Sequence, residues 1–293
     1  MKRREFLKGL GATFIMLKSS NYLRETESQN GDMIKRRLGR TNLMVSVIGY
    51  GGGGIVDWRQ AQIIREAIKL GVNFIDTAHK YGDGMSERVI GEAIKGLRDK
   101  VYIATKTVRR EAKGAEMDIK ESLARLQVEK IDILQMHGVS SMWDLEFILN
   151  EKYGALKKVK EYRALGKIDF IGITGAHSPI DGYWRIDSEK EIRVMAEAIK
   201  TGEFDTIMVS YHIEFQNDSI KALLELARQY DVGVICKKPL GAGKLIKKYG
   251  VEKLLKFVLS NPNIHTAIPG MRTIEEVRED VSIGLNKKGS SER

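Results

Sequence analysis

Residues 45–76, VSVIGYGGGGIVDWRQAQIIREAIKLGVNFID, form the unit from which the fold of this 293-residue chain follows. An apolar, β-branched run at 45–50 passes through four glycines into an amphipathic stretch at 60–70, and a second apolar run follows at 72–76. Apolar runs bounded by glycine are typical of buried strands, whereas apolar spacing of three and four residues is typical of helices. The stretch therefore predicts a strand, a helix and a second strand parallel to the first.

The glycines of this stretch also match a dinucleotide-binding pattern. Gly49, Gly51 and Gly54 have the spacing G-x-G-x-x-G. Asp76 stands 22 residues after Gly54, where a Rossmann site has its ribose-binding acid. Four consecutive glycines fit such a pattern by chance, so the organisation of the remaining chain has to distinguish the two interpretations.

The strand–helix unit recurs eight times along the chain. Apolar runs occur at 45–50, 72–76, 101–105, 131–136, 168–173, 206–211, 232–236 and 264–268. Stretches with helical spacing occur at 60–70, 86–97, 116–126, 155–165, 188–200, 219–230, 251–259 and 273–284. This alternation implies parallel strands joined by crossover helices, and eight such units fit a closed (β/α)8 TIM barrel better than an open sheet. We therefore expect an α/β protein with one barrel domain over residues 33–285.

The segment just before the first barrel strand predicts a β-hairpin. Residues 33–46 read MIKRRLGRTNLMVS, with turn-forming residues at 39–42. We expect this N-terminal hairpin to close the bottom of the barrel.

Residues 1–32 have the character of an export signal and a polar linker. The basic head RREFLK at 3–8 precedes a short apolar run, GLGATFIML, which is too short to span a bilayer but suits a signal peptide. The pattern of Arg3 and Arg4 followed by Phe6, Leu7 and Lys8 is typical of a twin-arginine motif. It predicts export to the periplasm or cell surface by the twin-arginine machinery. If the segment is not functional, the protein would be cytoplasmic. Residues 286–293 are expected to form a polar tail.

Charge and cysteine content exclude several classes of function. Residues 1–40 carry ten Lys and Arg against four Asp and Glu, and residues 285–293 carry three against one, so 41–284 hold only two of the ten net positive charges. Nucleic-acid binding needs basic residues concentrated on one surface, so no nucleic-acid partner is expected. The single cysteine, Cys236, excludes an internal disulfide and a cysteine-ligated cluster.

A barrel places its active site at the carboxyl ends of its strands, and chemically competent residues stand there. Asp76, Lys106 and His137 follow three neighbouring predicted strands, and Tyr81 stands five residues after Asp76. A lysine ammonium favours the phenolate and lowers the pKa of a nearby tyrosine, and a carboxylate holds such a lysine in place. A histidine can donate a hydrogen bond to a substrate carbonyl. The set predicts a proton donor for an oxyanion that forms when hydride reaches a carbonyl carbon.

The motifs around these residues resemble the aldo-keto reductase family. The resemblance extends from about Ile34 to Val281 and includes GVNFIDTAHKYGDGMSERVIGEAI, YIATK, LQMHG, GKIDFIGITG, GEFDT, KPLGAG and IPGMRTIEEV. It implies a barrel that binds NAD(P)H without a Rossmann fold. Tyr81 would be the general acid/base, with Lys106 and Asp76 tuning it and His137 orienting the carbonyl of a small-molecule substrate.

The resemblance also implies a cofactor site at the strand ends and the loops that follow them. NADPH is expected because Arg272 is the remaining cation near the expected 2′-phosphate, and arginine suits phosphate oxygens; NADH is the alternative. The implied cofactor-binding residues are Gly51, Gly52, Gly53, Thr174, Gly175, Lys237, Pro239, Leu240, Gly241, Gly243, Lys244, Gly270 and Arg272.

Several positions depart from the family pattern. Thr174-Gly175 stands where many members have Ser-Asn, Met208 stands at a glutamine position, and Lys237 stands where a tyrosine stacks on the nicotinamide. These departures alter the implied nicotinamide pocket. The segments KPLGAG and TGAH resemble a branch whose members often carry a cysteine-rich iron–sulfur extension, and no such extension is expected here.

Two other functions remain as alternatives. His137, His177 and His212 follow successive strands and suggest a metal-dependent hydrolase, although no His-x-His follows the first strand and no metal ligand is assigned. A nucleotide sensor without catalysis is the other alternative. The substrate is expected to contact loops at 138–153, 178–187 and 213–218, with Trp143 and Trp184 as candidate aromatic walls.

Overall fold

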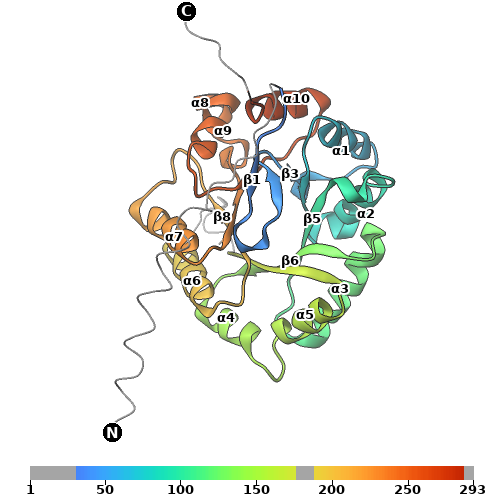
Figure 1. Ribbon diagram of the computed structural model, residues 1–293, viewed down its shortest axis with the longest axis vertical. Coiled ribbons are helices and arrows are strands. Elements are labelled where there is room, and N and C mark those ends of the chain that lie inside the picture. The colour runs from blue at the N-terminus through green and yellow to red at the C-terminus, as the bar shows by residue number, and fades with distance from the viewer. Residues whose placement is uncertain (1–30, 176–187, 287–293) are drawn as a thin grey trace, which may run out of the picture.

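The computed structural model describes residues 31–175 and 188–286, and its centre is an eight-stranded parallel barrel (Figure 1). Neighbouring strands pair in sequence order from β3 to β10. The first and last strands meet through a bridge between Ile48 and Ala267, and the Gly51 N–H donates to the Pro269 carbonyl at 2.9 Å. The strands are β3 (Tyr50–Gly51), β4 (Phe74–Asp76), β5 (Tyr102–Thr107), β6 (Ile131–Val139), β7 (Ile168–Gly175), β8 (Thr206–Ser210), β9 (Gly233–Lys237) and β10 (Thr266–Ile268). The predicted TIM barrel is confirmed.

Helices surround the strands on the outside of the barrel (Figure 1). Their apolar residues are buried against the strands, as at Ile64 of α1 and Leu223 of α7, and this packing forms the larger core. The helices are α1 (Gln60–Lys69), α2 (Met85–Ala93), α3 (Ala112–Leu126), α4 (Met142–Leu149), α5 (Ala155–Ala164), α6 (Ser188–Thr201), α7 (Asp218–Gln229), α8 (Ile246–Tyr249), α9 (Val251–Leu259) and α10 (Ile274–Ile283).

The predicted N-terminal hairpin is present and closes one end of the barrel. Its strands are β1 (Lys35–Arg37) and β2 (Met44–Ser46). Leu38 and Val45 are fully buried among the apolar side chains of the barrel interior. Arg37 forms an ion pair of 2.6 Å with Asp231, which precedes β9, so the hairpin lies at the amino-terminal ends of the strands.

Two sequence predictions need correction. The apolar run 45–50 is not one strand, because it spans the end of β2 in the hairpin and the start of β3 in the barrel. The expected loop 138–153 contains helix α4. Ser141 caps this helix by accepting a hydrogen bond from the Asp144 N–H, so the pattern S-x-x-D at 141–144 was the missed signal.

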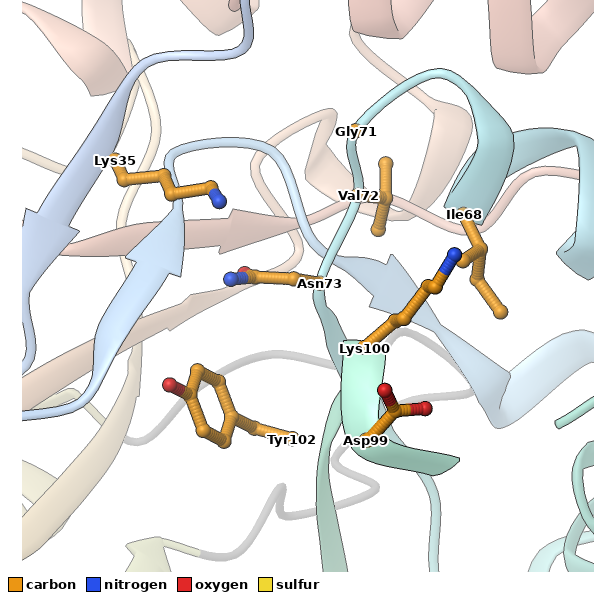
Figure 2. Close-up of a pocket in the computed structure, with 8 residues that line it drawn as sticks. All are labelled: Lys35, Ile68, Gly71, Val72, Asn73, Asp99, Lys100 and Tyr102. Carbon is orange, nitrogen blue, oxygen red and sulfur yellow. The ribbon is translucent and has the colours of Figure 1, made fainter. Parts of the chain in front are cut away.

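A cavity of about 370 Å³ lies at the amino-terminal end of the barrel, beside the hairpin (Figure 2). Asn73 on its wall accepts a hydrogen bond from Ser46 N–H and donates one to the Met44 carbonyl, so this side chain attaches the hairpin to the barrel. The cavity lies at the opposite end from the strand termini that carry Asp76 and Lys106. Its lining residues are Lys35, Ile68, Gly71, Val72, Asn73, Asp99, Lys100 and Tyr102.

The predicted export segment 1–32 and polar tail 286–293 lie almost entirely outside the described residues. Among the residues that are described, no helix is long and apolar enough to cross a bilayer.

Candidate active site

The four predicted catalytic residues meet at the carboxyl-terminal end of the barrel. Asp76 is the last residue of β4, Lys106 lies near the end of β5, and His137 lies in β6. Tyr81 begins the short 3-10 helix Tyr81–Gly84 that follows β4. The barrel therefore brings these side chains to one place from three neighbouring strands, as the sequence predicts.

Lys106 and Asp76 form a buried ion pair. The Lys106 Nζ lies 2.7 Å from each carboxylate oxygen of Asp76, and it also donates to the Thr77 carbonyl. Gln135 adds a hydrogen bond of 3.1 Å from its Nε2 to Asp76 Oδ1. Burial is the largest single effect and opposes a charge on Lys106, but Asp76 and Tyr81 together outweigh it and raise the pKa of Lys106 above its ordinary value. Lys106 is therefore a fixed positive charge.

Tyr81 lies against this charge and beside His137. The Lys106 Nζ is 4.8 Å from the centroid of the Tyr81 ring, and the rings of Tyr81 and His137 meet edge to face with their centroids 5.7 Å apart. Burial raises the pKa of Tyr81 above its ordinary value of 10.0, and the charge of Lys106 offsets only part of this rise. The predicted lowering of this pKa by Lys106 is therefore present, but burial outweighs it. At neutral pH the Tyr81 side chain is a phenol that can donate its proton.

The loop that carries Tyr81 is held by helix α3. Gly82 and Gly84 have φ values of 54° and 84°, which turn the chain sharply from Tyr81 into α2. Arg125 of α3 donates to the carbonyl of His79 at 3.2 Å. These constraints fix the position of the phenol relative to Lys106.

Close packing explains the first two residues of the glycine run at 51–54. A Cβ would lie 2.7 Å from the Ile268 carbonyl oxygen at Gly51 and 2.6 Å from the Asp76 carbonyl oxygen at Gly52. Gly51 and Gly52 therefore allow the chain to pack closely against β10 and β4 of the barrel, and the Rossmann interpretation is wrong.

The next two glycines lie beside site residues. A Cβ on Gly53 would contact the Tyr81 ring at 3.7 Å, and one on Gly54 would lie 3.6 Å from the Arg272 Nε. Gly270 is open, because the nearest atom to its Cβ position is the Gly51 carbonyl oxygen at 3.9 Å. Three predicted cofactor residues, Gly53, Gly270 and Arg272, therefore lie on the β3–β10 side of the mouth.

A second group of predicted cofactor residues meets between β7 and β9. The Lys237 Nζ donates to the Gly175 carbonyl at 2.8 Å and to the Thr174 Oγ1 at 3.2 Å. It also forms an ion pair of 2.9 Å with Glu191 of α6, a buried residue that the sequence analysis missed. Met208, the register partner of Thr174 on β8, packs against the apolar side chains of the barrel interior.

The segment after β9 forms a turn that is buried at Pro239 and becomes exposed from Ala242 onward. Lys238, Gly241 and Gly243 have left-handed backbone conformations, with φ values of 55°, 60° and 84°. Burial and the neighbouring charge of Lys237 lower the pKa of Lys238 to about 8. The predicted cofactor residues Pro239, Leu240, Gly241, Gly243 and Lys244 all lie in this turn.

The remaining predicted site residues are not brought into one cluster. Trp143 is 65% exposed on α4, where its ring contacts Phe147. His177 and Trp184 lie outside the described residues. Within residues 31–175 and 188–286, no group of three or more His, Cys, Asp or Glu side chains is arranged to hold a metal ion.

Comparison with known sequences identifies one protein family, and several enzymes are similar to this chain. The model of the Aldo/keto reductase family matches residues 47–253. The chain is 29% identical to L-galactose dehydrogenase of Arabidopsis thaliana, covering 88% of this chain and 92% of that protein. It is 28% identical to methylglyoxal reductase YeaE of Escherichia coli, covering 75% and 77% respectively.

Solved structures show the same fold. The holo form of aldo-keto reductase AKR11C1 from Bacillus halodurans superposes with a TM-score of 0.71 at 24% identity, covering 86% of this chain and 90% of that one. An aldo-keto reductase from Klebsiella pneumoniae in complex with NADPH superposes with a TM-score of 0.64 at 23% identity, covering 88% and 90%.

Proposed function

The chain belongs to the aldo/keto reductase family and is therefore an oxidoreductase, and we propose that it reduces the carbonyl group of a small aldehyde or ketone to an alcohol with NADPH. Tyr81 is the proton donor in this proposal. The observation that carries it is the Lys106 ammonium, which is bound by both oxygens of Asp76 and lies 4.8 Å from the centre of the Tyr81 ring.

The charge distribution of the site suits protonation of a developing alkoxide. When hydride reaches the carbonyl carbon, negative charge grows on the carbonyl oxygen, and the buried phenol of Tyr81 can donate a proton to it. The phenolate left behind is stabilised by Lys106, whose charge is fixed by Asp76. Such a general acid contributes roughly 10²- to 10⁴-fold to the rate.

His137 is suited to orient the substrate. Its ring meets the Tyr81 ring edge to face, so a carbonyl oxygen within reach of the Tyr81 hydroxyl also lies near the imidazole. A hydrogen bond from this ring would polarise the carbonyl and hold its oxygen toward Tyr81.

The surroundings of the four residues fit a nicotinamide nucleotide. Gly53 and Gly270 leave space beside Tyr81 and along β3, and Arg272 presents an exposed guanidinium next to Gly54 for a 2′-phosphate. NADPH supplies the hydride when bound. The other residues proposed to hold it are Gly51, Gly52, Thr174, Gly175, Lys237, Pro239, Leu240, Gly241, Gly243 and Lys244.

The test is consumption of NADPH by the purified protein with a panel of aldehydes and ketones. The names of the relatives suggest methylglyoxal and L-galactose as the first compounds to try, the latter with NADP⁺ in the oxidative direction. A reductase consumes NADPH only when a carbonyl compound is present. A sensor would bind NADPH without consuming it, and a metal hydrolase would show an activity that chelators abolish.

Export and placement within the family belong to the same proposal. The RREFLK motif at 3–8 supports export by the twin-arginine route, and KPLGAG at 238–243 supports a relation to the iron–sulfur-associated members. Fusion of residues 1–32 to a reporter tests the first point. Export should require Arg3 and Arg4, and equal export after replacement of both by lysine would contradict it.

A further inference from the structure

A second buried lysine–carboxylate pair lies at the mouth of the barrel, away from Asp76 and Lys106. Lys237 and Glu191 are 8% and 5% exposed, and their charged groups are 2.9 Å apart. The Lys237 ammonium donates hydrogen bonds to the Gly175 carbonyl and the Thr174 hydroxyl, and it contacts Glu191 Oε1 as an ion pair. Two of the Lys237 protons are therefore used at the end of β7, and Glu191 is the member of the pair that offers an acceptor to a ligand.

Glu191 reaches the mouth only because Gly175 has no side chain. A Cβ on Gly175 would lie 2.2 Å from the Glu191 Cγ and 2.3 Å from its Oε1. Glu191 belongs to the first turn of α6, outside the barrel, and its side chain crosses the end of β7 to meet Lys237. Gly175, Glu191 and Lys237 therefore form one contact cluster, in which the missing side chain of Gly175 leaves room for Glu191 to pair with Lys237.

Polar atoms in this arrangement have unused hydrogen-bonding capacity. In the described part of the chain, Glu191 Oε1 accepts no hydrogen bond, because its contact with Lys237 is an ion pair without hydrogen-bond geometry. The buried hydroxyl of Ser210, the register partner of Lys237 on β8, also has no hydrogen-bond partner there. Buried polar groups in this state cost free energy unless a ligand or water satisfies them.

The position of these atoms indicates which ligand group would satisfy them. In the proposed reaction the nicotinamide ring must lie beside the carbonyl carbon whose oxygen faces Tyr81. The charge of Lys237 acts on Asp76, so this second cluster is within electrostatic reach of the catalytic one. A nicotinamide carries one polar substituent, a carboxamide, whose NH₂ group needs an acceptor.

We propose that Glu191, held in place by Lys237, fixes the nicotinamide by accepting a hydrogen bond from the carboxamide NH₂ group. Glu191 is then a positioning residue for the cofactor, and it replaces an amide side chain that Gly175 cannot supply. This inference rests on the proposed function, because it requires that the chain bind a nicotinamide nucleotide.

The experiment compares how each protein variant binds two nucleotides that differ only in the carboxamide group. Dissociation constants are measured by tryptophan fluorescence for NADP⁺ and for its 3-acetylpyridine analogue, in which a methyl group replaces the NH₂. Wild type should bind NADP⁺ about ten-fold or more tightly than the analogue, as expected for a hydrogen bond to a carboxylate. In Glu191→Ala this ratio should fall close to one, because the acceptor is gone.

Two further variants keep the test decisive. Glu189→Ala, at an exposed position in the same turn of α6, should retain the wild-type ratio. Glu191→Gln preserves the side chain that crosses Gly175 and should give an intermediate ratio, which provides the measurement if Glu191→Ala does not fold.

The possible outcomes separate this inference from the proposed function. If the Glu191 variants weaken both nucleotides equally and leave the ratio unchanged, the pair has only a structural role and the inference is overturned. If wild type binds neither nucleotide, the proposed function fails as well.

Discussion

The mouth of the barrel contains two buried lysine–carboxylate pairs that differ in their surroundings. Lys106 contacts both oxygens of Asp76 and lies under the ring of Tyr81. Lys237 contacts one oxygen of Glu191 and is otherwise surrounded by backbone and hydroxyl acceptors. A buried lysine–carboxylate pair can therefore support proton transfer where a phenol lies against it, as at Tyr81. Where no phenol lies against it, as at Lys237, such a pair can only hold neighbouring groups in position.

Removal of each carboxylate should show how much the fold depends on each pair. Asp76→Ala leaves Lys106 fully buried without its counter-ion, and we expect the free energy of unfolding to fall by about 3–5 kcal/mol. Glu191→Ala should cost less, about 1–3 kcal/mol, because Lys237 keeps two other acceptors. Urea unfolding of both variants measures the difference. An equal loss would mean that the two pairs are equivalent for stability.

Removal of each lysine should separate proton chemistry from positioning. The Lys106 charge lowers the pKa of Tyr81 against the larger effect of burial, so Lys106→Met should raise this pKa further and make the phenol a weaker acid. We expect kcat to fall roughly 10- to 100-fold, less than the 10²- to 10⁴-fold typical for loss of a general acid, because Tyr81 keeps its hydroxyl. The alkaline fall of kcat, which reflects loss of the Tyr81 proton, should move to higher pH.

Lys237→Met is the matched control for this shift. Its side chain is not among those that perturb Tyr81, so the alkaline limb of the pH profile should stay where it is in wild type. A similar shift in both variants would contradict the distinction between the two pairs. Tyrosinate absorbance, measured as the difference between each protein and its Tyr81→Phe counterpart, gives the pKa directly.

The smallest effect is expected at the exposed edge of the mouth. Arg272 lies on the surface beside Gly54, where solvent screens its charge. Arg272→Ala should weaken NADPH binding by about two- to five-fold, in keeping with exposed ion pairs, and should leave NADH binding unchanged. Titration with both nucleotides measures this. Equal losses for the two would mean that Arg272 does not recognise the 2′-phosphate.

The fold and the Asp76 side of the mouth could be predicted from sequence because their signals are local. Strand and helix periodicity recurs in every unit, and Asp76, Lys106 and His137 each stand at the end of an apolar run. Parallel strands bring such positions together at one end of the barrel, independently of the conformation of the loops. The hairpin was predicted for the same reason, from its turn residues.

The Glu191 side could not be predicted because it depends on contacts between distant segments. In the sequence, Glu191 is an ordinary acidic residue of a predicted helix. Only the structure shows that Gly175, which has no side chain, allows Glu191 to reach Lys237. The net pKa shift of Tyr81 was missed because burial, its largest cause, is not visible in sequence. Helix α4 replaces the predicted loop because Ser141 caps a helix there, as the pattern S-x-x-D at 141–144 allows.

The most direct test of the account is the rate of carbonyl reduction by Tyr81→Phe, measured together with its affinity for NADPH. This change keeps the ring against Lys106 and His137 and removes only the hydroxyl. We predict that kcat falls by roughly 10²- to 10⁴-fold, while the dissociation constant for NADPH changes less than two-fold, as expected for a group that faces the substrate. Reduction by Tyr81→Phe at the wild-type rate would contradict the assignment of Tyr81 as proton donor.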